Sequence, residues 1–257
     1  MRFLKLTLAY DGTRYVGWQV QPNGISVQQR LEEAWKAVTG EARRITASGR
    51  TDSGVHAEGQ ICSVRTVSKL DVHVLARALN ANLPDDIAVV YCHEMSEDFH
   101  AIRDAIEKTY RYQIQSGPIR DVHGRHFWWY VPPSIDVGAM ATAADYLIGE
   151  HDFASFQTTG SERKSTVRTI TNLSVDSHDD QGYQRVCIEV TANGFLYNMV
   201  RCIAGTLAVV GKGREAPDWV RNVLNARCRS NAGPTAPPQG LFLQHVKYAA
   251  KFMPEST

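Results

Sequence analysis

The alternation of apolar and polar residues along this chain predicts an ordered series of strands and helices. Apolar residues at every second position over 4–10 predict a first strand with one buried face. Apolar residues three and four apart over 27–38 predict a helix that Ser26 caps, with Gln29 completing a capping box, and that Gly40 ends. The same pattern predicts strands at 45–48, 57–67 and 87–92, and a helix at about 72–82 before Pro84.

This order of elements is that of a split βαβ, ferredoxin-like domain, and the second half of the chain nearly repeats it. We therefore predict an α+β fold of two tandem ferredoxin-like (RRM-like) α/β sandwiches with antiparallel sheets, an N-terminal lobe at 1–105 and a C-terminal lobe at 106–257. A central cleft between such lobes is a common place for a ligand. The second lobe is predicted to contain strands at 108–114, 167–175, 183–191 and 241–248, and helices at 137–147, 195–210 and 217–226.

Residues 49–56 read Gly-Arg-Thr-Asp-Ser-Gly-Val-His, a composition that suits neither a helix nor a strand interior. Asp52 is predicted to lie on a tight connection between two strands, because glycines on both sides allow positive φ or a close backbone approach. A carboxylate held on a rigid turn beside Arg50 is a candidate functional acid. The alternative is that Asp52 only hydrogen-bonds its own turn, as Asx residues often do.

The composition is that of a soluble globular chain, with 43% hydrophobic and 21% charged residues among 257. No apolar run approaches the length that spans a bilayer, and the start of the chain lacks a basic segment followed by an apolar run. We therefore expect no membrane segment and no export signal. The five cysteines form no Cys-x-x-Cys pair, so we expect reduced thiols in a cytoplasmic protein.

Net charge gives no argument for a polyanionic partner, because 28 Lys and Arg nearly balance 27 Asp and Glu. A basic face could still form by clustering in the C-terminal half. The alternative for most of these cations is an ordinary solvated surface charge. The cations concerned are Arg163, Lys164, Arg168, Arg201, Lys212, Arg214, Arg221, Arg227 and Arg229.

Residues 120–133 carry four consecutive aromatic side chains among several cations. Such residues can stack on unpaired bases, although core packing or a subunit interface is the more common role of adjacent Trp residues. His123 and His126 are three residues apart, but no third ligand accompanies them, so we expect no metal site. The stretches 160–164 and 229–239 are expected to be mobile or RNA-facing, and the prolines of the second require an extended chain.

Arg201 lies off the apolar face of the helix predicted at 195–210, on a stripe with Tyr197 and Gly205 at four-residue steps. Glycine lowers helix propensity and is tolerated where something must approach the helix closely. A half-buried guanidinium needs an anion, and Asp52 is a candidate partner. An ordinary surface arginine is the alternative.

Five ordered blocks together carry a family resemblance that covers nearly the whole chain. They are GRTDSGVHA at 49–57, KTYRY at 108–112, DFASF at 152–156, GFLYNMVR at 194–201 with Gly205, and APPQGLFL at 236–243. In this order they resemble the TruA family of tRNA pseudouridine synthases. The segment from Tyr10 to Gln19 is similar to that family's N-terminal signature.

The resemblance implies an enzyme without cofactor or metal that isomerises uridine to pseudouridine in the anticodon stem-loop of tRNA, at positions 38, 39 and 40. It implies a homodimer, with one tRNA reaching across both subunits. Asp52 matches the catalytic nucleophile, Tyr110 the active-site tyrosine, and Arg201 the arginine paired with the aspartate. Arg50 matches the arginine that takes the place of the flipped base, and Leu241 lies in the apolar block that closes the pocket.

The reaction suits these residue types. Isomerisation breaks the bond between N1 and C1′, rotates the uracil and rejoins it through C5. A carboxylate can attack C1′ or C6, or can assist loss of the C2′ proton, and the sequence leaves these three routes open. Asp52 must be ionised at neutral pH, a form that an arginine partner favours. Tyr110 can stack on the flipped base and could relay a proton.

Three positions depart from the family pattern. Ser53 stands where Ala or Lys is usual, Ile102 stands where Arg is common, and Ser48 precedes Gly49. Arg103 is on a different face from Ile102, so no phosphate contact is carried over to it.

Two other functions compete with this interpretation. A glycosidase needs a second carboxylate, which none of these blocks supplies beside Asp52. A non-catalytic RNA-binding protein would keep the aromatic and basic residues but would have no use for Asp52.

Overall fold

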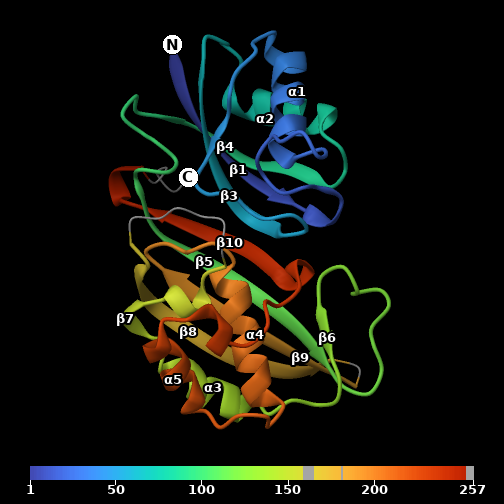
Figure 1. Ribbon diagram of the computed structural model, residues 1–257. Helices are drawn as coiled ribbons and strands as arrows, with labels where there is room; N and C mark the ends of the chain where they lie inside the picture. Colours follow the sequence, from blue (N-terminus) through green and yellow to red (C-terminus); the bar gives the residue numbers. More distant parts are fainter. Residues whose placement is uncertain (159–164, 181, 253–257) are drawn as a thin grey trace. The chain divides into compact units, whose positions relative to one another are not determined.

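The computed structural model describes residues 1–158, 165–180 and 182–252. Over these residues the chain is a mixed α+β protein whose strands pair mostly in the antiparallel sense (Figure 1). Its contacts divide it into two compact units, unit 1 with Met1–Lys108 and Phe242–Thr257, and unit 2 with Thr109–Leu241. In the described ranges, no helix is both long enough and apolar enough to cross a bilayer.

These units differ from the predicted lobes in where the last strand belongs. The predicted lobe 106–257 includes that strand, whereas contacts place it in unit 1 from Phe242 onward. The reason is a strand pairing between residues far apart in the sequence, since Phe242 and Leu243 pair in parallel with His56 and Ala57.

Unit 1 contains a sheet in the order β4-β1-β3-β10, with the short β2 paired to β3. The pairs of β1 with β3 and with β4 are antiparallel. Helices α1 and α2 lie together against one side of this sheet (Figure 1). The bounds are β1 Arg2–Tyr10, α1 Val27–Thr39, β2 Thr46–Ala47, β3 His56–Thr66, α2 Val72–Asn82, β4 Ile87–Met95 and β10 Leu241–Tyr248, with 3-10 turns η1 Gly12–Arg14 and η5 Ala250–Phe252.

The core of unit 1 follows the predicted apolar pattern. Leu4, Leu6 and Leu8 of β1 are fully buried, as are Leu31 and Trp35 of α1. Burying each such side chain contributes roughly 1.5–3 kcal/mol before entropy is counted. The apolar positions predicted from periodicity therefore do form the contact between helices and sheet.

The predicted ends of α1 are confirmed, but its capping box is only half formed. The Ser26 hydroxyl accepts the Gln29 amide N–H at 3.2 Å, and Gly40 ends the helix with φ of 73°. The Gln29 side chain donates to Glu33 at 2.9 Å rather than returning to the Ser26 amide. A single cap bond is therefore enough to start this helix.

Unit 2 contains the strand order β5-β9-β8-β7, with β6 parallel to β5. Helices α3, α4 and α5 lie on one side of these strands (Figure 1). The bounds are β5 Ala105–Ser116, β6 Trp129–Val131, α3 Val137–Asp145, β7 Gly149–Asp152, β8 Val167–Asp180, β9 Tyr183–Ala192, α4 Met199–Gly211 and α5 Trp219–Ala226, with 3-10 turns η2 Ala154–Phe156, η3 Arg229–Asn231 and η4 Pro238–Gly240. Strand β5 begins in unit 1 and enters unit 2 after Lys108.

Helix α4 begins four residues later than the sequence pattern predicts. Asn198 precedes it with φ of 61°, a left-handed conformation that interrupts helical geometry at that position. Tyr197 therefore lies outside the helix, and the predicted stripe through Tyr197, Arg201 and Gly205 is wrong.

Candidate active site

The Asp52 turn lies between β2 and β3, but the predicted tight connection is wrong. Thr46 and Ala47 pair with Ser63 and Cys62, well along β3, so residues 48–55 form a long loop beside the first part of that strand. This loop needs external contacts to hold its shape, because residues 48–55 lie outside the β2–β3 ladder.

One set of contacts comes from the loop after β1. The Trp18 amide donates to the Thr51 carbonyl at 3.0 Å, and the Tyr15 carbonyl accepts from the Gly54 amide at 3.3 Å and the Ser53 hydroxyl at 3.2 Å. Gly17 has φ of 98°, and a Cβ there would lie 2.5 Å from the Thr51 carbonyl oxygen. Only glycine permits this approach. The Ser53 departure therefore adds a hydrogen bond to the turn.

A second set of contacts holds the start of the turn from within unit 1. The Gln60 side-chain amide donates to the Gly49 carbonyl at 2.9 Å, and the Ser48 hydroxyl donates to Gln60 Oε1 at 2.8 Å. Lys108 Nζ donates to the Ser48 carbonyl at 2.7 Å. Ser48 is buried and has a defined partner, so this departure is structural.

Tyr10 holds the residue next to the candidate nucleophile. Its phenol oxygen lies 2.8 Å from the Thr51 hydroxyl, and both side chains are buried. Burial raises the pKa of Tyr10 well above its ordinary value, so the phenol keeps its proton for hydrogen bonding. Asp52 itself is half-buried, whereas Arg50 is exposed. The turn therefore presents one carboxylate and one cation on a backbone fixed from both sides.

His56 supports the same turn and was missed as a separate site residue. It is buried, its ring stacks on Phe242 with centroids 4.6 Å apart, and its Nδ1 lies 3.1 Å from both the Gly12 amide nitrogen and Asp11 Oδ1. A neutral ring accepts the Gly12 N–H at Nδ1, whereas a protonated ring donates to Asp11. Its place at the end of the GRTDSGVHA block was the only sequence signal.

Unit 2 places Tyr110 in β5. Tyr110 is buried and meets Phe195 edge-on, with ring centroids 5.0 Å apart. Tyr112, two residues on, donates from its hydroxyl to the Pro237 carbonyl at 2.7 Å. Strand β5 thus links the tyrosine block to the segment that precedes Leu241.

Arg201 is also fixed within unit 2. Its Nε donates to the Ala236 carbonyl at 2.7 Å, and its Nη1 donates to Asn198 Oδ1 at 2.7 Å. The Ala236 amide in turn donates to the Arg201 carbonyl at 3.1 Å. The side chain is half-buried, so the interpretation as an ordinary surface arginine is wrong.

Gly205 confirms the prediction that something approaches α4 closely. A Cβ there would lie 1.7 Å from the Pro234 carbonyl oxygen. The stretch 229–239, expected to be mobile or RNA-facing, is hydrogen-bonded to α4 and to Tyr112, so it is anchored within unit 2. Leu241 lies beyond this stretch and is buried.

The 120–133 insertion packs within unit 2. Its β6 pairs with β5, and Gln113 donates to the Phe127 carbonyl at 2.9 Å. Trp129 meets Tyr112 edge-on at 6.1 Å. These aromatics are half-buried and make packing contacts within unit 2. Within the ranges that the structure describes, no cluster of three or more His, Cys, Asp or Glu side chains could hold a metal ion.

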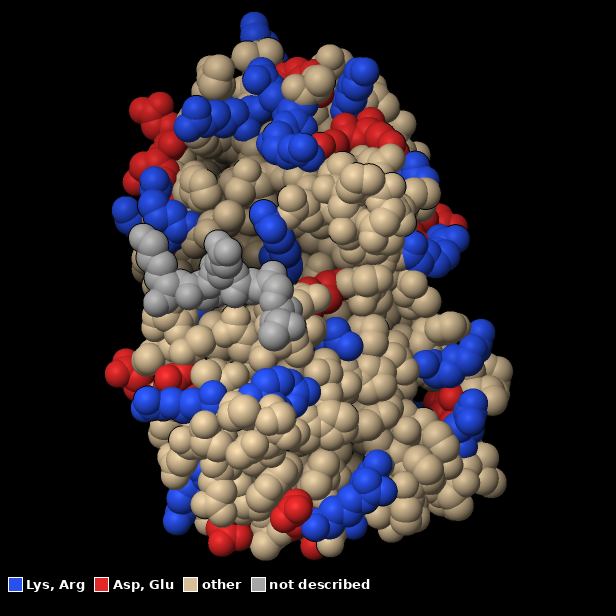
Figure 2. All heavy atoms as spheres, viewed as in Figure 1, with Lys and Arg blue, Asp and Glu red and all other residues tan. Residues whose placement is uncertain are grey.

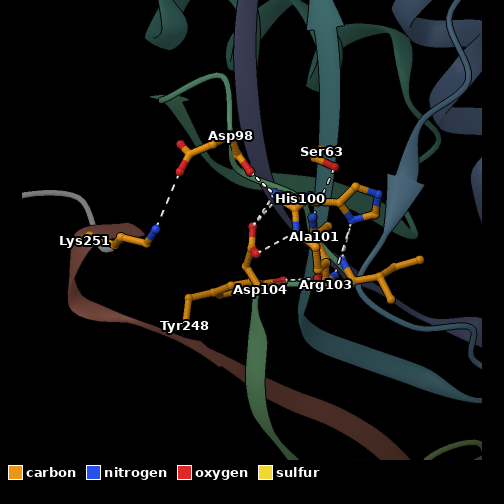
Figure 3. Close-up of polar contacts among 9 residues, drawn as sticks. Ser63, Asp98, His100, Ala101, Arg103, Asp104, Tyr248 and Lys251 are labelled. Atoms are coloured by element: carbon orange, nitrogen blue, oxygen red, sulfur yellow. Dashed lines mark hydrogen bonds and ion pairs between the residues drawn. The ribbon is translucent and has the colours of Figure 1, made fainter.

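The Phe99–Asp104 loop contains Ile102, one of the three positions described above as departures. Ile102 is exposed, while Arg103 donates to the Asp104 carboxylate at 3.1 Å and to the Asp98 carbonyl (Figure 3). His100 Nδ1 accepts from the Ile102 amide at 3.2 Å, and Tyr248 donates to the Ala101 carbonyl at 2.6 Å. The guanidinium of Arg103 therefore serves the loop itself.

Several cations suggested for a basic face have internal partners. Arg221 stacks over Tyr146 at 4.3 Å, and Arg227 lies 3.3 Å from Asp152. Figure 2 shows positive and negative side chains scattered together over the face it draws. Arg163 and Lys164 lie outside the described residues.

The candidate site residues therefore fall into two sets. Unit 1 holds Arg50 and Asp52 on one anchored turn, and unit 2 holds Tyr110 on β5 and Arg201 and Leu241 next to the 233–240 segment. A carboxylate on a fixed turn, a buried tyrosine and an anchored arginine are residue types that enzymes use for acid–base or nucleophilic chemistry.

Comparison with known proteins identifies the family. A family model described as tRNA pseudouridine synthase matches residues 7–104 and 143–249. The chain belongs to this family.

Curated relatives extend the match over almost the whole chain. A protein of Thermoanaerobacter sp. strain X514 is 42% identical, and one of Pelobacter propionicus is 44% identical, each covering 96% of this chain and 100% of the relative. A Moorella thermoacetica protein is 45% identical with the same coverage. All three bear the name tRNA pseudouridine synthase A. Among solved structures, a Cbf5-Nop10-Gar1 complex matches with a TM-score of 0.35 and 10% identity over 80% of this chain and 45% of that one, too weak a likeness for any argument.

Proposed function

We propose that Asp52 is the nucleophile with which this protein isomerises uridine to pseudouridine in tRNA. Membership of the tRNA pseudouridine synthase family makes the protein an isomerase that acts on tRNA. The observation that supports the role of Asp52 is its turn. Contacts from residues 10–18, 60 and 108 hold the backbone on both sides of a half-buried carboxylate. Such pre-organisation is what a nucleophile needs in order to meet a flipped base.

Four further residues complete the proposed site. Tyr110 stacks on the flipped uracil or relays a proton, and Arg201 keeps Asp52 ionised as its counter-ion. Arg50, exposed beside Asp52, fills the space that the flipped base leaves. Leu241 closes the pocket over the base. These roles come from the family resemblance, and the burial of Tyr110 and the two side-chain bonds of Arg201 support them.

The finer architecture is also a proposal. The order β4-β1-β3, with β2 on β3 and both helices on one side, supports a ferredoxin-like arrangement for unit 1. We extend it to unit 2, where β5, β9 and β8 are neighbours and helices cover one side, so that the protein consists of two tandem ferredoxin-like sandwiches.

The proposed substrate site is the anticodon stem-loop, at positions 38, 39 and 40, and the proposed working form is a cytoplasmic homodimer that needs no cofactor. The relatives' name supports a tRNA substrate. The position in the stem-loop and the dimer rest on the family resemblance.

The test of the nucleophile is Asp52→Asn. The amide keeps the shape of the turn but cannot act as a nucleophilic carboxylate, so we expect turnover of tRNA to fall by about 10³-fold or more. The fold should be unchanged, and the dissociation constant for tRNA should stay within a few-fold of the wild-type value. Carbodiimide labelling and primer extension detect the product, and Asp85→Asn, which removes an exposed carboxylate of unit 1, is the matched control. Substantial turnover by pure Asp52→Asn protein would rule out the assignment.

The counter-ion role of Arg201 has a separate test. In Arg201→Ala the Asp52 carboxylate loses a favourable cation, so the acid limb of the pH–rate profile should move to higher pH while the rate collapses. Arg201→Lys keeps the charge and should keep the acid limb near its wild-type position, although it loses the two side-chain bonds to Ala236 and Asn198. An unchanged pH profile in Arg201→Ala would show that the two groups do not interact.

A further inference from the structure

The segment 233–240, here called the strap, is held at several points along its length. The Gly233 amide donates to the Thr206 hydroxyl at 3.1 Å, and the Pro234 carbonyl fills the space that a side chain at 205 would occupy. The Gly240 backbone packs on the Tyr112 ring, where a Cβ would lie 2.8 Å from the ring carbon Cζ. The strap leads directly into Leu241. The path of the strap therefore determines the positions of Leu241 and of the Ala236 carbonyl, which accepts from Arg201.

Arg229 also anchors the strap, and it lies in neither α4 nor β5. Its Nη1 donates to the Gly233 carbonyl at 2.8 Å, and its Nη2 donates to the Thr235 hydroxyl at 2.9 Å. One planar guanidinium thus fixes two strap residues, a geometry that the single ammonium of lysine cannot reproduce. The side chain is half-buried.

The base of Arg229 is itself fixed. The Cys228 amide donates to the Ser155 hydroxyl at 2.8 Å, and that hydroxyl donates to the Val223 carbonyl of α5 at 2.6 Å. The backbone next to Arg229 is therefore fixed, which limits the positions that its guanidinium can take at the strap.

A short path connects Arg229 to Arg201. Arg229 holds Thr235, the next residue is Ala236, and the Ala236 carbonyl accepts from Arg201 Nε at 2.7 Å. If the strap shifts, Arg201 loses the acceptor that orients its guanidinium. Leu241, at the end of the strap, shifts with it.

We propose that Arg229 is a positioning residue of the active site, which sets the strap and through it the orientation of Arg201 and the place of Leu241. This inference rests on the proposed function of Arg201 and Leu241. It also assigns Arg229 a role other than phosphate binding, because donors of its guanidinium already serve the strap.

The test compares Arg229→Ala and Arg229→Lys with wild type and with Arg77→Ala, a change to a surface arginine of α2 in unit 1. Single-turnover rates on tRNA should fall roughly 10- to 100-fold in Arg229→Ala, because small displacements of catalytic groups have effects of this size. Arg229→Lys should restore part of the rate. The tRNA dissociation constant should change less than about 3-fold, and the slope of its logarithm against that of salt concentration should stay unchanged, whereas loss of a phosphate contact lowers that slope by about one.

Two further measurements separate positioning from general destabilisation. Amide hydrogen exchange should rise in peptides that cover the strap and not elsewhere in Arg229→Ala. Thr235→Val removes one acceptor of Arg229 with little change of shape, and should lower the rate in the same direction. Combined with Arg229→Ala it should add less than its effect alone, since both changes break the Arg229–Thr235 hydrogen bond, while Thr235→Val also removes the 3.5 Å contact of that hydroxyl with Cys202 Sγ. Thr235→Val carries the test alone if Arg229→Ala does not fold.

A wild-type single-turnover rate in Arg229→Ala would overturn the proposal, as would a salt slope that falls by about one. If the wild-type protein itself isomerises no uridine in tRNA, the proposed function fails. The exchange experiment would then still show whether Arg229 holds the strap.

Discussion

At the scale of single residues, Arg185, Arg201 and Arg229 show that some arginines of unit 2 act as internal anchors. Arg185 is buried and lies 2.7 Å from the Asp121 carboxylate and 3.2 Å from Asp180. It also stacks over Trp128 at 4.6 Å and Tyr183 at 5.0 Å. A buried guanidinium needs such partners, because an unpaired charge in the interior is costly. These contacts bind the 120–133 insertion to β9.

Asp121 makes this anchor dependent on pH. The hydrogen bond from Arg185, followed by one from the Gly124 amide, lowers the pKa of Asp121 from 3.8 to about 2. A carboxyl whose pKa is lower in the folded state stabilises that state above its ordinary pKa, and this stabilisation is lost as pH falls through the lowered value. The stabilisation by Asp121 is therefore complete above about pH 4 and disappears towards pH 2.

We expect Asp121→Asn to be less stable than wild type at pH 7 and to approach it as pH falls from about 4 to about 2. Urea unfolding across this range measures the difference. Asp145→Asn, which removes an exposed carboxylate at the end of α3, is the control and should follow wild type throughout. A difference between Asp121→Asn and wild type that stays constant over the whole range would contradict the ion-pair explanation.

At the scale of elements, helix α4 is organised by the segment that crosses it. Gly205 weakens the helix by roughly 1 kcal/mol relative to alanine, yet it lets the Pro234 carbonyl approach. Thr206 accepts from the strap at the next position, and its hydroxyl donates to the Cys202 carbonyl at 2.7 Å. Glycine at 205 therefore lowers the intrinsic stability of the helix but permits a tertiary contact that helps to position Arg201 and Leu241.

Gly205→Ala tests this balance. Propensity alone would make the variant more stable, but a Cβ 1.7 Å from the Pro234 oxygen forces the strap or the helix to move. We expect a net loss of about 1–3 kcal/mol in the free energy of unfolding, together with reduced activity. Gly138→Ala in α3 is the control, because its Cβ would meet the nearest atom, Asp136 Oδ1, at an acceptable 3.4 Å. Gly138→Ala should be as stable as wild type or more stable. If Gly205→Ala were also more stable than wild type, the strap would not need the space that glycine leaves at position 205.

At the scale of the whole molecule, a chain with net charge of +1 has to hold a polyanion. We expect a homodimer to supply the phosphate contacts, since two-fold symmetry doubles the cations that face one tRNA. Affinity should fall steeply with salt. Replacing Arg163 and Lys164 together should lower the log–log slope by up to about two if both contact phosphate, although they lie outside the described residues. Light scattering checks the dimer, and a fully active monomer or a salt-independent dissociation constant would contradict this prediction.

The sequence by itself determined the local elements and the chemistry-bearing blocks. Period-two and period-3.6 patterns depend on neighbours along the chain, so α2 lies at Val72–Asn82 and β10 at Leu241–Tyr248, as predicted. The Asp52 block was recognisable for a related reason, because its residues suit neither element.

Only the tertiary structure decided which distant residues meet. Residues 10–18 fix the Asp52 turn, β10 joins unit 1 through β3, and the strap crosses α4 at Gly205. The same structure makes the half-buried Arg201 and Arg229 donors to backbone carbonyls, while Arg103 donates to one from an exposed position. A cation looks the same in a sequence whether it faces solvent or a carbonyl, and the choice depends on which buried acceptors the fold brings within reach.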